Sequence, residues 1–123
     1  MPVRTLAVVA VVISLVGIAV NLNLANDVTP AQTEMLRPLN GAVVRGRILL
    51  DASAPQGVTK VEFHATGRGL RNTVVATGTS SAYGWLAYWN ASTVPPGRYH
   101  IWSVAYIGGS ENISRAIDVT VSS

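Results

Sequence analysis

The sequence contains no cysteine, so disulfide bonds, thiolate metal sites and cysteine nucleophiles are all excluded. It is also poor in charge, because only 12% of its residues are Asp, Glu, Lys or Arg. The nine cationic residues exceed the six acidic ones by three, but eight of the nine are arginines scattered singly along the chain. No basic tract for nucleic acid is present, and no nucleic-acid partner is expected.

Several catalytic signatures are missing as well. The sequence has no Gly-x-Ser-x-Gly elbow and no glycine-rich loop between a strand and a helix. Its carboxylates are scattered along a short chain, which leaves little room for a cleft with two opposed acids. The two histidines, His64 and His100, fall on outer faces of neighbouring predicted strands near Glu62, but they lack the close spacing of zinc ligands. We expect no enzymatic activity, no metal and no cofactor.

A long apolar run stands near the N-terminus. Arg4 precedes residues 6–20, which only Ser14 and Gly17 interrupt. A signal peptide fits this run, because residues 17–19 supply a small-x-small cleavage site. A signal anchor also fits, because residues 5–24 are just long enough to cross the hydrocarbon core as a hydrophobic helix. In either case the positive-inside rule places the rest of the chain across the membrane, either anchored with its C-terminal domain extracytoplasmic or secreted.

From residue 33 onward, short runs rich in Val, Ile, Thr, Tyr and Trp alternate with breaks that contain Gly, Pro and Ser. This pattern predicts an all-β domain with seven strands, at residues 33–37, 43–52, 58–66, 73–79, 85–90, 98–107 and 113–121. Strands at this spacing are typical of an antiparallel β-sandwich. The predicted organisation is therefore a signal anchor or signal peptide (1–25), a linker (26–32) and one folded domain (33–123).

Period-two alternation assigns the two faces of the strand at residues 98–107. One face carries Tyr99, Ile101, Ser103 and Ala105, and the other carries His100, Trp102, Val104 and Tyr106. If the first set faces the core, the second set forms an aromatic and aliphatic stripe on the outer surface. Exposed patches of this kind mark partner surfaces. We expect this stripe, together with Tyr88, to bind a partner.

Five short motifs within residues 35–121 carry a resemblance to a known family. They are PLNGAVVRG at 38–46, GVTKVEF at 57–63, YWN at 88–90, TVPPGRY at 93–99 and IDVTV at 117–121. In this combination and spacing the region resembles the bacterial Ig-like domains of exported and cell-surface proteins. The resemblance implies an Ig-like sandwich in which Trp89 and Tyr99 point into the core. The sequence departs from the family at residues 105–111, where a family Asp and Gly-Asn turn are replaced, so no calcium role is carried over.

Together these features predict a non-catalytic interaction module, membrane-tethered or secreted, that serves as an accessory subunit of an envelope complex or assembles with its own copies. Two alternatives stay open. A carbohydrate-binding module would use Trp102 and Tyr106 as stacking platforms and would need coplanar exposed rings. A pilin-like subunit would pack its N-terminal helix into a filament, although no Lys-Gly or Arg-Gly processing site precedes the apolar run. Asn-x-Ser sequons at Asn90 and Asn112 leave glycosylation open.

Overall fold

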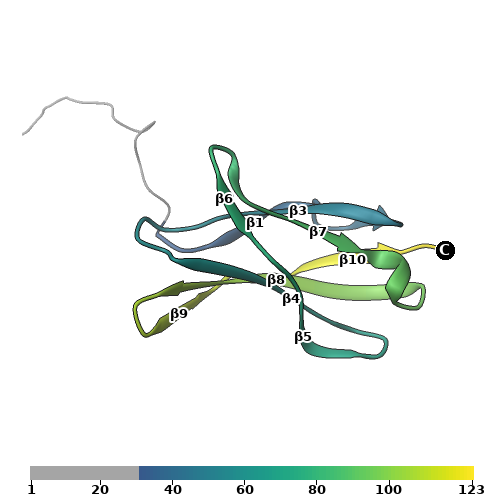
Figure 1. Ribbon diagram of the computed structural model, residues 1–123. Coiled ribbons are helices and arrows are strands. Elements are labelled where there is room, and N and C mark those ends of the chain that lie inside the picture. The colour runs from purple at the N-terminus through teal and green to yellow at the C-terminus, as the bar shows by residue number, and fades with distance from the viewer. Residues whose placement is uncertain (1–30) are drawn as a thin grey trace, which may run out of the picture.

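The computed structural model describes residues 31–123, which form two β-sheets packed face to face (Figure 1). Sheet A consists, in spatial order, of β1 (Glu34–Arg37), β3 (Arg47–Ser53), β7 (Gly84–Asn90) and β6 (Thr79–Ser81). Sheet B consists of β2 (Ala42–Val44), β10 (Ile117–Val121), β8 (Gly97–Ile107), β4 (Lys60–Gly67) and β5 (Leu70–Thr77), with β9 (Ser110–Ile113) paired to β8. A short 3-10 turn, η2 (Ala91–Thr93), joins β7 to β8. The predicted all-β sandwich is confirmed.

The predicted number of strands is wrong, because residues 31–123 contain ten strands rather than seven. Three predicted strands are each divided between two elements. The predicted strand at residues 43–52, for example, supplies β2 to sheet B and β3 to sheet A, with the crossing at Gly46, whose φ is +66°. A left-handed φ suits glycine, and Gly46, between Arg45 and Arg47, separates β2 from β3. The sandwich is also not wholly antiparallel, since β2 pairs with β10 in parallel.

The hydrophobic helix predicted for residues 5–24 lies outside the described residues, as does most of the linker predicted at residues 26–32. In the part of the chain that the structure describes, no helix has the length and apolar character needed to span a membrane.

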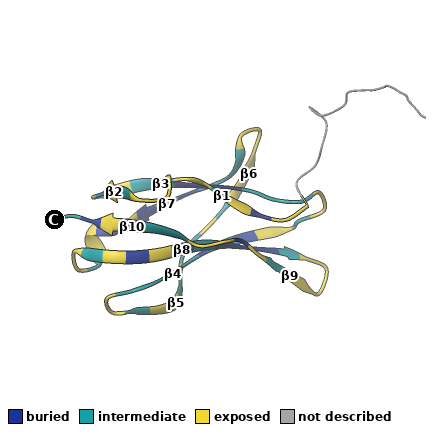
Figure 2. Cartoon of the chain, turned by 180° about the vertical axis from the view of Figure 1, so that it is seen from behind, coloured by how far each residue is buried: buried dark blue, intermediate teal, exposed yellow. Residues whose placement is uncertain are grey.

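The core lies between the two sheets, where the buried segments of the central strands face one another (Figure 2). The predicted inward set of β8 is confirmed, because all four of its members are fully buried: Tyr99, Ile101, Ser103 and Ala105. The predicted inward orientation of Trp89 is confirmed as well, with 4% of the residue exposed. The rings of Trp89 and Tyr99 meet edge to face with their centroids 6.2 Å apart, so the two sheets share one aromatic contact.

Tyr99 also fixes the turns at one end of the sandwich. Its hydroxyl donates to the carbonyl oxygen of Pro95 at 2.5 Å and lies 3.3 Å from that of Arg68. Its ring passes so close to Gly67 that a Cβ added there would lie 2.1 Å from the ring. The turn after β4, which carries Arg68, and the turn before β8 are thus held against one side chain.

Candidate functional site

The four outward residues of β8 share the outer face of sheet B, as predicted, but they are less exposed than predicted. His100 is exposed, whereas Trp102 and Tyr106 are half-buried. The prediction of an exposed Val104 is wrong, because only 3% of it is accessible. The hairpin after β8 explains this, since β9 returns alongside β8 and sets Ile113 directly opposite Val104.

Polar side chains from the neighbouring strand hold the two half-buried rings in place. Glu62 of β4 accepts a hydrogen bond at its Oε1 from the Tyr106 hydroxyl at 2.7 Å. This Oε1 also lies 3.2 Å from His64 Nε2. The Lys60 ammonium lies 4.6 Å from the centroid of the Tyr106 ring and 3.5 Å from the other Glu62 oxygen. The His64 ring lies 5.8 Å from that of Trp102. We call these five residues the sheet B network.

The hydrogen bond from Tyr106 fixes the ionisation of both partners. It is the main reason that the pKa of the Glu62 carboxyl lies below its usual value, an effect that burial opposes. The same bond, with burial, raises the pKa of Tyr106 to about 12. Glu62 is therefore a carboxylate and Tyr106 a phenol at neutral pH. On the outer face of sheet B, the polar groups of Glu62, His64 and Tyr106 therefore contact one another.

The two histidines do not form a shared metal site. His64 Nδ1 lies 2.8 Å from Asn72 Oδ1, whereas His100 Nδ1 lies 2.5 Å from Asp118 Oδ1. Within residues 31–123, no group of three or more potential metal-ligating side chains comes together.

Tyr88, the fifth residue predicted to bind a partner, lies on the opposite side of the molecule. It belongs to β7 of sheet A, where the inward positions are taken by Trp85, Ala87 and Trp89. Its ring is 56% exposed on the outer face of sheet A, and the guanidinium of Arg47 lies 4.0 Å from its centroid. The prediction that Tyr88 joins the β8 stripe is therefore wrong, because sequence alternation assigns a face within one strand but not the sheet to which that strand belongs.

Sheet A carries an exposed apolar surface that the sequence reasoning missed. A groove of about 880 Å³ lies on this side, and its lining includes Leu36, Leu39, Leu49 and Tyr83. Leu49 stands opposite Tyr88 in the β3–β7 register, which joins Tyr88 to the groove. We call Leu36, Leu39, Tyr83 and Tyr88 the sheet A surface; they are 40%, 75%, 81% and 56% exposed. Strand alternation could have predicted that Leu36 points outward, because its neighbour Met35 packs against the core. Alternation could not have predicted that β1, β3 and β7 lie side by side in one sheet.

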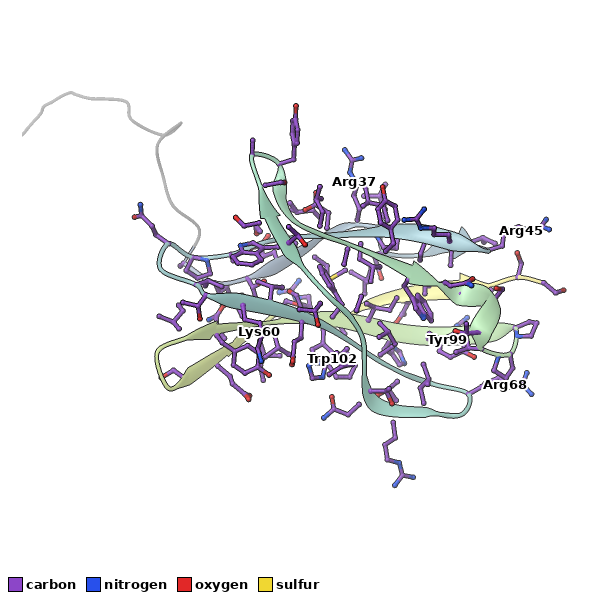
Figure 3. All side chains as sticks on the ribbon, viewed as in Figure 1. Arg37, Arg45, Lys60, Arg68, Tyr99 and Trp102 are labelled. Carbon is purple, nitrogen blue, oxygen red and sulfur yellow. The ribbon has the colours of Figure 1, made fainter. Side chains whose placement is uncertain are left out.

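A buried carboxyl group borders this groove. Asp51 of β3 is only 5% exposed, and its Oδ1 has no hydrogen-bond partner among residues 31–123. Burial raises the pKa of Asp51, while the nearby Arg37 guanidinium acts in the opposite direction. Figure 3 shows Arg37 on the outer side of sheet A, opposite the side on which Trp102 lies. The groove thus combines apolar walls with one cationic and one acidic group.

The sequence matches no protein-family model and no curated protein. Among solved structures, the endo-beta-1,4-mannanase from Thermotoga petrophila is similar with a TM-score of 0.61 and 13% identity, over 81% of this chain and 21% of that one. An engineered protein is similar with a TM-score of 0.56 and 20% identity, over 83% of this chain and 25% of the other. At these identities the likeness is one of fold. The chain spans a quarter or less of the length of both proteins.

Proposed function

We propose that this chain is a non-catalytic, Ig-like interaction module that binds a protein partner through the sheet A surface, in an extracytoplasmic position secured by residues 5–24. The single observation that carries the proposal is the grouping of Leu36, Leu39, Tyr83 and Tyr88 around one groove. Lone exposed apolar residues are ordinary, but a contiguous group of them is typical of a binding surface.

The order of the strands supports the Ig-like assignment. Sheet A runs β1-β3-β7-β6, the order of strands A, B, E and D in an immunoglobulin sandwich. In sheet B, β10, β8 and β4 follow the order G, F and C, with further strands at the edges. The bond from the Tyr99 hydroxyl to a backbone carbonyl four residues upstream resembles the tyrosine corner of such domains.

The difference between the two outer faces favours sheet A, and not the β8 stripe, as the partner surface. Burying a group that already has good contacts gains little, and separating Tyr106 from Glu62 would leave a carboxylate without its main donor. Tyr83 and Tyr88 instead offer large apolar areas whose burial is favourable, at about 25 cal/mol for each Å² removed from water.

The carbohydrate alternative receives less support from the same geometry. A sugar stacks on an open ring face, but the Trp102 ring lies against His64 and Lys60 lies over Tyr106. Neither half-buried ring provides the open platform that this alternative requires.

Co-purification of the full-length protein from its native membranes tests the proposed surface. We expect substitution of Leu36, Tyr83 and Tyr88 by Ser to abolish retention of the partner with little change in melting temperature, because these side chains are exposed. The matched control is Val43→Ser with Val74→Ser, two positions that are 71% and 45% exposed in sheet B. Equal loss of partner in both variants, or in neither, would remove the sheet A surface from consideration.

Membrane fractionation tests the proposed location. If residues 5–24 are an anchor, carbonate extraction should leave the full-length chain in the membrane fraction, and protease added outside should remove the β-domain. A soluble species that begins near residue 20 would instead identify a cleaved signal peptide. Protection of the domain from external protease would contradict the extracytoplasmic location.

A further inference from the structure

Five of the arginines lie together at one end of the sandwich, although they are far apart in the sequence. They come from the β2–β3 turn and the start of β3 (Arg45, Arg47), the β4–β5 turn and the start of β5 (Arg68, Arg71), and the start of β8 (Arg98). We call this group the arginine end. Figure 3 shows Arg45 and Arg68 at that end and Lys60 toward the other.

Contacts between the turns confirm that these segments are neighbours. The amide of Ala91 donates to the carbonyl of Gly46 at 2.7 Å, which joins η2 to the β2–β3 turn. Arg68 donates from its guanidinium to the Pro96 carbonyl at 3.0 Å, which joins the β4–β5 turn to the start of β8. The strand register pairs Arg47 with Asn90, the residue immediately before η2. The five arginines therefore lie on segments that adjoin one another at one end of the sandwich.

This end carries an unbalanced positive charge. All five arginines are exposed, and none forms a salt bridge with another residue of the described range 31–123. Asp118 of β10 lies opposite His100, two residues after Arg98 in β8. Its carboxylate is already paired with His100. Ser123 also lies at this end. A surplus of fixed positive charge attracts and orients anionic groups.

Parts of the arginine end are held ready for binding. The hydrogen bond to Pro96 positions the Arg68 guanidinium, and the ring of Tyr88 supports that of Arg47 at 4.0 Å. Arg45, with Ser92 and Ser122, borders a hollow of about 340 Å³ between the β2–β3 turn and η2. Guanidinium groups present a planar fork that matches the two oxygens of a carboxylate, and a fork already positioned loses less entropy on binding.

We infer that the arginine end binds an acidic polypeptide segment of the partner protein, an inference that rests on the proposed function. The point at which the chain enters the domain favours a protein, and not the bilayer that holds the anchor, as the ligand of the arginine end. Thr33, near the start of the described residues, donates a hydrogen bond from its Oγ1 to the carbonyl oxygen of Ser53 at the far end of β3, whereas Arg47 begins that strand. Seven strand residues separate the two ends by roughly 20 Å. A domain tethered at its entry end therefore points its arginines away from the membrane, toward a partner.

Binding of poly-L-glutamate to the full-length protein in detergent micelles tests the inference. We expect binding that weakens strongly as NaCl rises to about 0.5 M, since salt screens exposed charges. Arg45→Gln with Arg98→Gln should weaken it by about tenfold, which is what two exposed ion pairs contribute. The matched control, Arg37→Gln with Arg115→Gln, removes the same charge elsewhere and should change binding by no more than about twofold.

Equal effects of the two double variants would overturn the inference, as would binding that salt does not weaken. Tighter binding to alginate or to anionic vesicles than to poly-L-glutamate would also overturn it, and would assign the arginine end to a uronate polysaccharide or a lipid surface. The outcome is distinguishable from failure of the proposed function, because Leu36→Ser with Tyr83→Ser keeps Tyr88 beneath Arg47 and should leave poly-L-glutamate binding unchanged. A partner lost with the sheet A variants but kept with Arg45→Gln and Arg98→Gln would overturn this inference alone.

Discussion

At the scale of single residues, Gly67 shows how one side chain can dictate its neighbour. Its φ is not in the left-handed region, so alanine would fit the backbone, but a Cβ would lie 2.1 Å from the Tyr99 ring. Tyr99 is fully buried and cannot move aside without disturbing the core. We expect Gly67→Ala to lower the free energy of unfolding by roughly 2 kcal/mol or more, as overpacking does. Urea denaturation measures this change.

Gly109 provides the control for that substitution. It also has no left-handed φ, and a Cβ there would meet no atom within 4 Å. Gly109→Ala should therefore leave the free energy of unfolding within about 0.5 kcal/mol of wild type. Equal stability of the two alanine variants would show that the Tyr99 ring does not lie so close to Gly67.

Asp51 predicts a pH dependence. Burial raises its pKa and outweighs the attraction of Arg37. A raised pKa in the folded state means that the stabilising contribution is fully present below the unfolded pKa of about 4 and is lost as pH rises through the folded value. We expect Asp51→Asn to melt a few degrees above wild type at pH 7, with the gap closing as pH falls toward 4. Thermal melts across this range, with Glu34→Gln at an exposed position as reference, would contradict this if the gap stayed constant.

At the scale of the element, the pairing of β4 with β8 depends on more than its backbone ladder. The Tyr106 hydroxyl donates to Glu62 across the two strands at 2.7 Å. We expect Tyr106→Phe to reduce the free energy of unfolding by roughly 1–2 kcal/mol at pH 7, because the acceptor is charged. Tyr83→Phe, at a position that is 81% exposed, should cost almost nothing.

The pH dependence of that cost identifies its origin. The pKa of Glu62 is lowered in the fold, so its contribution is present above the unfolded pKa of about 4.3 and disappears as pH falls through the folded value. The difference between wild type and Tyr106→Phe, measured by urea denaturation, should therefore shrink in acid. A difference that persists unchanged at low pH would mean that the Tyr106 hydroxyl contributes by packing alone.

Alternation within strands was predictable, whereas the assignment of strands to sheets was not. The period of two correctly separated Tyr99 and Ile101 from His100 and Trp102, because the direction of a side chain is a local property of an extended backbone. Tyr88 was placed with the wrong group, because the sheet to which β7 belongs is decided by long-range pairing. The crossing at Gly46 was missed for a related reason, because strand-forming residues lie on both sides of this single glycine, at 43–44 and at 48–50.

At the scale of the whole molecule, three surfaces differ in chemistry. The outer face of sheet A is apolar, the outer face of sheet B holds an internally satisfied polar network, and one end is cationic. The composition concealed this division, because a net charge of +3 spread singly along the sequence gives no sign of clustering. Antiparallel strands return the chain to the same end repeatedly, so turn residues distant in sequence become neighbours.

The same architecture predicts that the two tryptophans Trp89 and Trp102 differ in their energetic importance. Trp89 is 4% exposed between the sheets and in contact with Tyr99, whereas Trp102 is half-buried on an outer face beside His64. Trp89→Ala should cost about 3–5 kcal/mol, because it leaves a cavity that packed sheets cannot close. A small domain has a total stability of about 5–15 kcal/mol, so this variant should be close to unfolding at ambient temperature.

Trp102→Ala, by contrast, should cost no more than about 2 kcal/mol, because water can occupy the space that it leaves. Urea denaturation followed by far-ultraviolet circular dichroism measures both variants independently of the tryptophan signal that each one loses. A Trp89→Ala protein that melts within a couple of degrees of wild type would show that the two sheets do not pack through this residue. Equal costs for the two substitutions would mean that the outer face of sheet B is as enclosed as the core.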